Sequence, residues 1–205
     1  LGIKFSHEKD FLKRCLDEAG ICVLHAPLFH PAMKNVAPIR KELGVKTFFN
    51  MLGPMVNPAF PKNQLVGVFD LELARMYGYL YQKSEKNYAV LHAMDGYDEI
   101  SLTGPVKVIS KASETILNAA DFGVKQIEES EIFSGETVKA SAEIFLNILN
   151  GKGTQAQNNV VCANAGMAIS VVENCTIKDG FEKAKESLKS GKAMNSLKKL
   201  QKISD

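Results

Sequence analysis

The sequence lacks the features that mark membrane proteins and disulfide-stabilised proteins. It has no run of about 18 apolar residues, which argues against a membrane-spanning helix. Its four cysteines form no CxxC pair, and its four histidines have no zinc-type spacing. We therefore expect free thiols, no structural zinc site and a reducing, cytoplasmic environment.

The sequence also lacks a strong excess of charge of one sign. The formal net charge is +2 over 205 residues, and the lysines of the last two expected helices are most simply a solvated face. No aromatic stacking pattern accompanies these lysines. We expect neither a nucleic-acid partner nor a membrane partner, and a non-catalytic paralogue that binds nucleic acid stays as an alternative.

The motifs of several common catalytic sites are absent as well. The sequence has no GxGxxG fingerprint, no P-loop and no nucleophile elbow. No Ser/His/Asp arrangement can be argued from it either. We therefore predict no catalytic side chain and expect the function to depend on residues that bind and orient ligands.

The pattern that is present is an alternation of strands and helices. Five segments are typical of strands: 21–25, 64–69, 88–92, 105–109 and 114–117. A helix over 71–82 separates the second from the third, which favours a parallel sheet. The last two are expected in an antiparallel part, and from Ser134 the chain turns helical. The sequence predicts a single α/β domain, residues 1–205, with a mainly parallel sheet flanked by helices.

The stretch from His30 to Pro58 is stiffened by proline and glycine and is also rich in polar side chains. Proline fixes φ and glycine permits positive φ, so this composition is more typical of a shaped binding surface than of a flexible loop. Arg40 carries a planar guanidinium suited to a carboxylate or phosphate. His30 either hydrogen-bonds a substrate or closes the loop.

Asp98 and Glu99 are adjacent carboxylates that follow the expected strand at 88–92. Paired oxygen ligands suit Mg²⁺, which binds substrate phosphates while keeping several waters. The alternative is a solvated turn or a helix cap. Ligands of parallel sheets bind beyond the C-terminal ends of the strands. We therefore expect this pair and the His30–Pro58 stretch to face one crevice.

Three segments together resemble the anthranilate phosphoribosyltransferase family: HPAMKNVAPIRKELGVKTFFNMLGPMVNPA, VLHAMDGYDEIS and LTGPVKVI. The resemblance continues through NNVVCANAGMAI and covers essentially the whole chain. It implies the large α/β domain of the nucleoside phosphorylase/phosphoribosyltransferase type. It also implies transfer of the 5-phosphoribosyl group from 5-phosphoribosyl 1-diphosphate to anthranilate in tryptophan biosynthesis, with Mg²⁺ as cofactor.

The resemblance assigns roles to individual residues. Arg40 matches the family arginine that contacts the anthranilate carboxylate, and Asp98 with Glu99 matches the acidic pair that binds Mg²⁺. Three further residues match the wall of the channel through which anthranilate enters: Ala26, Pro27 and His30. Lys46 and Ala93 depart from the family pattern, which usually has arginine and glycine there.

The family's enzyme is longer at its N-terminus, where it carries a small helical domain, a GTGGD loop that cradles pyrophosphate and a KHGNR segment. Neither motif occurs in this sequence. The resemblance therefore implies a truncated, C-terminal part of the enzyme, inactive by itself. It also implies a parent enzyme that is a homodimer through the helical domain.

A pyrimidine nucleoside phosphorylase is the alternative enzyme with the same fold. It would use phosphate as the acceptor and act on a pyrimidine nucleoside. The FNMLGPMVNP segment and Arg40 argue against it.

Overall fold

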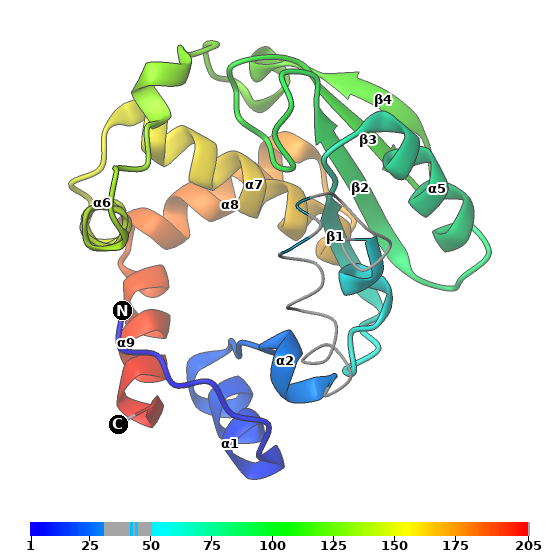
Figure 1. The fold of residues 1–205 in the computed structure, drawn as a ribbon. Helices are drawn as coiled ribbons and strands as arrows, with labels where there is room; N and C mark the ends of the chain where they lie inside the picture. Colours follow the sequence, from blue (N-terminus) through cyan, green and yellow to red (C-terminus); the bar gives the residue numbers. More distant parts are fainter. Residues whose placement is uncertain (31–41, 43, 45–50, 205) are drawn as a thin grey trace. The chain divides into compact units, whose positions relative to one another are not determined.

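The computed structural model describes residues 1–30, 42, 44 and 51–204 (Figure 1). The chain divides into two compact units, residues 1–60 together with 192–205, and residues 61–191. The prediction of a single domain over residues 1–205 stays a prediction.

The helices are α1 (Lys9–Arg14), α2 (Ala26–Phe29), α5 (Leu71–Tyr81), α6 (Val138–Leu149), α7 (Gln155–Glu173), α8 (Ile177–Lys189) and α9 (Lys192–Ser204). The strands are β1 (Asn63–Gly67), β2 (Asn87–Ala93), β3 (Val106–Ser110) and β4 (Glu114–Leu117), and the short helical turns are η1 (Cys15–Ala19), η2 (Gly53–Met55), η3 (Ala119–Phe122) and η4 (Glu129–Ile132).

The second unit is built on a four-stranded sheet in the order β1-β2-β3-β4. β1 pairs with β2 in parallel, with Val66 opposite Val90, whereas β3 runs antiparallel to both β2 and β4. The predicted α/β class with flanking helices is confirmed. Within the described residues the sheet is mixed rather than mainly parallel, because one pairing of three is parallel.

The lengths of the connections explain the strand directions. β1 and β2 are joined through α5, and a helical crossover returns the chain in its starting direction. β3 and β4 are joined by a tight turn in which the Ser110 amide donates to the Ser113 carbonyl at 2.8 Å. A turn this short can only join antiparallel strands. The antiparallel placement predicted for the last two strands is confirmed.

Strand β2 is buried on both of its faces because helices cover the sheet on each side (Figure 1). Ala89 and Leu91 belong to a core cluster that includes Phe181 of α8. Tyr88 lies on the alternate face, with its ring centroid 5.3 Å from that of Tyr81 on α5. Burial raises the pKa of Tyr81 to about 12. The apolar run of β2 is therefore explained by a strand between two helical layers.

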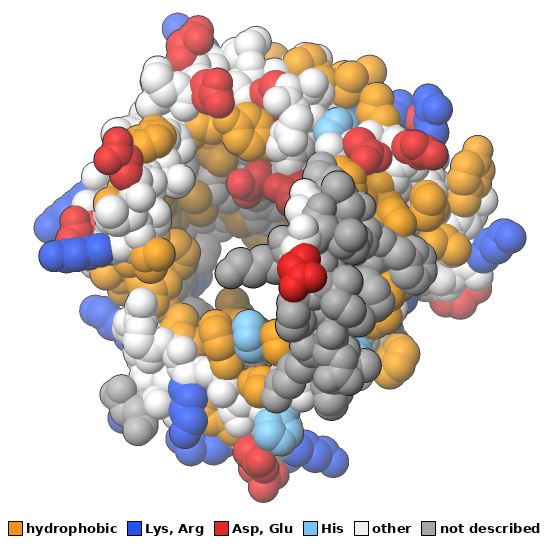
Figure 2. All heavy atoms as spheres, in the orientation of Figure 1, with side chains coloured by type: hydrophobic (Ala, Val, Ile, Leu, Met, Phe, Trp, Pro, Cys, Tyr) orange, Lys and Arg blue, Asp and Glu red, His pale blue; other side chains and the backbone are white. Residues whose placement is uncertain are grey.

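Helix α5 begins after the N-cap residue Asp70. The Asp70 carboxylate accepts a hydrogen bond from the Leu73 amide at 2.7 Å, which satisfies one free donor of the first turn. The outward face carries Met76, Tyr79 and Leu80, and Figure 2 shows hydrophobic side chains at the surface over this helix. Leu80 on this outward face is 47% exposed.

Helices α7 and α8 meet at a close backbone contact that two glycines permit. A Cβ atom at Gly166 would lie 2.6 Å from the amide nitrogen of Phe181. A Cβ atom at Gly180 would lie 2.2 Å from the carbonyl oxygen of Gly166. Any side chain at either position would force the helices apart.

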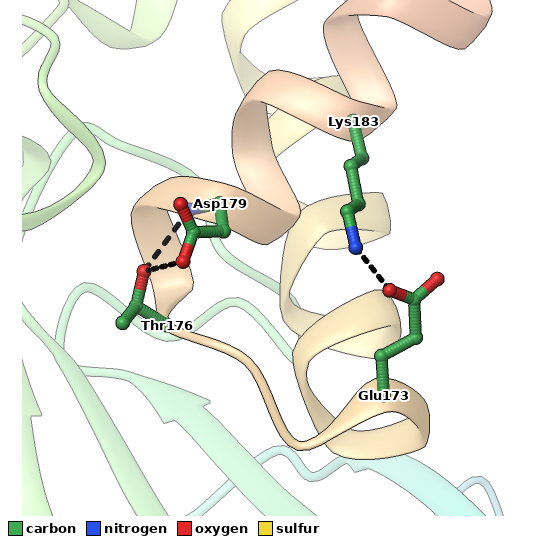
Figure 3. A network of polar contacts seen from close by, with 4 residues as sticks. All are labelled: Glu173, Thr176, Asp179 and Lys183. Carbon is green, nitrogen blue, oxygen red and sulfur yellow. Dashed lines mark hydrogen bonds and ion pairs between the residues drawn. The ribbon is translucent and has the colours of Figure 1, made fainter.

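Polar contacts hold the turn between α7 and α8 (Figure 3). The Thr176 hydroxyl donates to the Asp179 carboxylate at 2.7 Å and accepts from the Asp179 amide at 3.2 Å, which caps α8. Lys183 of α8 forms an ion pair with Glu173 at the end of α7. Both charged side chains are about half exposed, so the pair contributes little to stability.

The first unit has its own small core, formed by Cys15, Ala19, Leu200 and Ile203. The Ser196 hydroxyl of α9 donates to the carbonyl of Ala19 at 2.8 Å, which ties the C-terminal helix to the N-terminal one. Gly20, with φ of 75°, follows η1 in the left-handed region. A glycine in this conformation ends the helix.

The strand predicted over residues 21–25 is wrong. These residues have no strand conformation, and no described strand pairs with them. A strand needs a neighbour to satisfy its backbone groups, so an apolar run without one takes another conformation. His25, expected inside this strand, instead stacks on Phe5 with ring centroids 4.7 Å apart.

The sequence predicts no membrane-spanning helix and no disulfide bond, and the described residues allow both expectations to be examined. No single described helix has the length and apolar composition of a membrane span, although α7 and α8, bent by 118°, meet both criteria as a pair. All four cysteines are free, which confirms the expected thiols.

Candidate functional site

Asp98 and Glu99 lie in the loop that follows β2, at the C-terminal end of a buried strand. Both residues are exposed. The Ala93 amide donates to the Tyr97 carbonyl at 3.0 Å, and Gly96 has φ of 102°, so the chain turns back directly before the pair. No described residue forms an ion pair with either carboxylate. The two carboxylates are therefore available to a ligand.

The backbone of this loop is pressed against strand β1. A Cβ atom at Gly67, the last residue of β1, would lie 1.5 Å from the carbonyl oxygen of Asp98. No side chain can occupy that position without moving the loop. The absence of a side chain at Gly67 therefore sets how closely the acidic pair approaches the sheet.

Asn164 of helix α7 binds the backbone of Ile100, which directly follows the acidic pair. The Ile100 amide donates to the Asn164 side-chain oxygen at 2.9 Å, and the Asn164 amide group donates to the Ile100 carbonyl at 2.8 Å. Ile100 is 1% exposed, so both hydrogen bonds form in a largely dehydrated environment. They fix the backbone of the residue directly after Glu99.

A hydroxyl–carboxylate network closes the loop at its base. The Thr103 hydroxyl donates to Asp95 and lies 2.7 Å from the Ser101 hydroxyl, which also donates to Asp95 at 3.1 Å. Leu102, between them, is 1% exposed and has φ of 63°. A buried leucine with positive φ is held there only by surrounding contacts, and such strain is frequent near functional sites.

A cavity of about 270 Å³ is lined by Glu99 together with residues of the η4 region. Tyr97 and Glu129 line it as well, and the Tyr97 hydroxyl donates to the Glu129 carboxylate at 2.8 Å. This hydrogen bond raises the pKa of Tyr97. Glu129 is thereby engaged by a neighbour, whereas no described cation pairs with Glu99.

Helix α2 in the first unit brings together the three residues that the resemblance assigns to a channel wall. Ala26 and Pro27 form its first turn, and the His30 amide donates to the Ala26 carbonyl at 2.9 Å. Pro27 favours the start of a helix because its missing donor is not needed there. His30, which the sequence left as either a substrate ligand or a loop closure, ends this single turn.

Arg40 lies outside the described residues. Asp98 and Glu99 belong to the second unit, whereas α2 belongs to the first. The crevice that the sequence predicts between the His30–Pro58 stretch and the acidic pair therefore stays a prediction.

Asn164, Gly67 and Thr103 were missed in the sequence, although all three support the loop. For Asn164 a signal was present, because an amide in the middle of the apolar run VVCANAGMAI needs a partner if it is buried. For Gly67 and Thr103 the sequence has no comparable signal. Their role depends on which segments pack together.

Asp98 and Glu99 give the loop two adjacent carboxylates that can bind a cation. The described residues contain no group of three or more potential metal-binding side chains. Two adjacent carboxylates match the way Mg²⁺ is usually held, by one or two carboxylates with water and substrate phosphates as the other ligands. The donor set therefore fits Mg²⁺ better than zinc.

The described fold is that of an α/β protein with two adjacent carboxylates in the loop beyond the buried strand β2. The class is that of a glycosyl transferase, since the profile described as "Glycosyl transferase family, a/b domain" matches residues 1–194. The chain belongs to this family.

Within the family, three similar proteins have the same enzyme name. The anthranilate phosphoribosyltransferase of Christiangramia forsetii is 69% identical over 204 residues, which are 100% of this chain and 62% of that protein. The enzyme structure from Thermus thermophilus has a TM-score of 0.89 and 28% identity, covering 99% of this chain and 61% of that one. The Saccharomyces cerevisiae enzyme "in complex with PRPP and Mg" has a TM-score of 0.78 and 28% identity, covering 87% and 52%. The resemblance seen in the sequence is confirmed, and the chain spans about 62% of the length of the relatives it matches.

Proposed function

We propose that the natural protein containing this chain is an anthranilate phosphoribosyltransferase. The amine nitrogen of anthranilate attacks C1 of 5-phosphoribosyl 1-diphosphate. A C–N bond forms, the C–O bond to diphosphate breaks, and the amine proton leaves to solvent. The similarity over the full length of the chain to enzymes of that name supports this activity.

The Asp98 and Glu99 carboxylates would hold Mg²⁺. Both side chains are exposed, and no described residue forms an ion pair with them. When bound, the cation offsets negative charge that develops on the leaving diphosphate. The protein itself holds the two negatively charged side chains next to each other, in a loop whose backbone is fixed by Asn164. The Saccharomyces cerevisiae relative, solved with PRPP and Mg, supports the use of Mg²⁺.

Anthranilate would be bound by Arg40 and by the α2 turn. A guanidinium can make two parallel hydrogen bonds to the carboxylate of anthranilate. Ala26, Pro27 and His30 are then the wall of the channel through which anthranilate enters. Their position on a single turn of helix supports a common surface.

The observation that carries the proposal is the pair of exposed carboxylates in the loop after β2, which form no ion pair with any described residue. The test is steady-state kinetics of the natural protein with both substrates over a series of Mg²⁺ concentrations. We expect the double variant Asp98→Asn, Glu99→Gln to lose about 100-fold or more in kcat/KM, because the charge stabilisation by a metal is worth several kcal/mol.

Glu136→Gln is the matched control, since it removes an exposed carboxylate remote in sequence from the loop. Full activity of the double variant with an unchanged Mg²⁺ response would remove Asp98 and Glu99 from the metal site. Phosphorolysis of thymidine without anthranilate turnover would favour the nucleoside phosphorylase instead.

The resemblance also supports a homodimer of the natural protein and a cytoplasmic location, without a nucleic-acid or membrane partner. Light scattering of the natural protein tests the dimer. A monomer at micromolar concentration would contradict it.

A further inference from the structure

The residue directly after the acidic pair has both of its backbone groups bound by one side chain. Asn164 accepts from the Ile100 amide and donates to the Ile100 carbonyl, at 2.9 and 2.8 Å. The Asn164 amide group also donates to the Val160 carbonyl of its own helix at 3.0 Å, which fixes the orientation of the side chain. A 19-residue helix thus holds the loop at a defined point.

The loop is closed a second time at its base. The Thr103 hydroxyl donates to Asp95, a residue eight positions earlier in the chain, and contacts the Ser101 hydroxyl. This bond links the two ends of the segment that contains Asp98 and Glu99. Without it the segment would be free to sample more backbone conformations, at an entropic cost to any ligand that orders it.

We propose that Asn164 and Thr103 are positioning residues that hold the Asp98–Glu99 turn in the conformation that binds a divalent cation. Neither side chain needs to touch the cation. They act through the backbone of Ile100 and through Asp95, so that the carboxylates are already oriented when the cation arrives. The inference rests on the proposed function, because it takes the acidic pair to be the metal site.

The test uses the natural protein with Mn²⁺ in place of Mg²⁺. Bound Mn²⁺ is measured by loss of the free-ion electron paramagnetic resonance signal in the presence of 5-phosphoribosyl 1-diphosphate, against a blank without protein. We expect Asn164→Ala to raise the Kd for Mn²⁺ about tenfold, which is the usual effect of losing a residue that orients a metal ligand. Hydrogen exchange of the Ile100 amide should accelerate in the same variant.

Asn159→Ala is the matched control. Asn159 lies on the same helix, and its side chain accepts a hydrogen bond from Gln155, also of that helix. We expect its Kd for Mn²⁺ to stay within about twofold of the wild type, because this hydrogen bond involves no residue of the loop. Thr103→Val is the second variant, since it removes the hydroxyl but keeps the shape and every charge, and it serves if Asn164→Ala does not fold. It should raise the Kd by a few-fold.

The outcomes separate the inference from the function on which it rests. If Asp98→Asn, Glu99→Gln abolishes Mn²⁺ binding while the folded Asn164→Ala and Thr103→Val variants bind like the wild type, the positioning role is overturned and the metal site stands. If the double variant binds Mn²⁺ normally, the metal site itself is wrong, and the inference falls with it.

Discussion

Single residues decide how the acidic loop is held. Gly67 permits close approach of the Asp98 backbone because it has no Cβ atom. Asn164 replaces two hydrogen bonds that the Ile100 backbone would otherwise make with water. The charge of the carboxylates comes from Asp98 and Glu99, but their orientation comes from residues distant in sequence.

The residue with the sharpest expected effect on substrate binding is Arg40. Arg40→Ala in the natural protein should raise KM for anthranilate, because a lost charge-assisted hydrogen bond costs about 1.5–3 kcal/mol, or about 10- to 150-fold. Arg40→Lys should give an intermediate KM, since lysine keeps the charge but loses the planar fork. Steady-state kinetics at saturating 5-phosphoribosyl 1-diphosphate measures both.

Arg14→Ala is the control for a lost surface guanidinium. Arg14 is 60% exposed and pairs with Glu18 one helical turn away, so its removal should leave KM unchanged. Anthranilate kinetics unaltered in Arg40→Ala would reject the carboxylate-binding role.

At the scale of elements, the helix pair α7–α8 depends on the crossing at Gly166 and Gly180. Gly166→Ala or Gly180→Ala should lower the free energy of unfolding by about 1–3 kcal/mol, since overpacking of a close contact costs that much. Backbone atoms meet the added methyl group in both cases, so no side-chain rotation can relieve the clash. Urea denaturation of the natural protein measures the change.

Gly53→Ala provides the comparison. A Cβ atom there meets no described atom within 4 Å, and the glycine has no positive φ, so the effect should stay within about 0.5 kcal/mol. Equal stability of all three variants would show that the α7–α8 contact is looser than the structure has it.

Most elements could be predicted from the sequence because their signals are local. Asp70 caps α5 and Gly20 ends the first helix, both through the residue's own chemistry. The buried positions of α9 recur every three residues, as the amphipathic pattern indicates. The strand predicted over residues 21–25 was wrong because an apolar run becomes a strand only beside another strand.

At the scale of the whole molecule, the expected transferase activity of the isolated chain depends on two motifs that residues 1–205 lack. Residues 1–205 carry neither GTGGD nor KHGNR. The resemblance implies that GTGGD cradles the pyrophosphate and that KHGNR helps to bind both substrates. We expect no measurable transferase activity from purified residues 1–205 and normal activity from the natural protein. Turnover by the isolated chain, measured as N-(5-phosphoribosyl)anthranilate formed, would contradict this.

The sequence by itself determined the types of element, their caps and the residues able to carry the chemistry. These depend on backbone preferences and side-chain functional groups, which act over a few residues. It also determined the family, since the segments that carry the resemblance are continuous in the chain.

Only the tertiary structure decided which supports meet the acidic pair. Ile100 and Asn164 are 64 residues apart, and no local rule brings them together. The mixed sheet was decided in the same way, because the direction of a strand follows from its connection and its neighbours. Packing over long sequence separations is a property of the whole folded unit, so it cannot be predicted from any one segment.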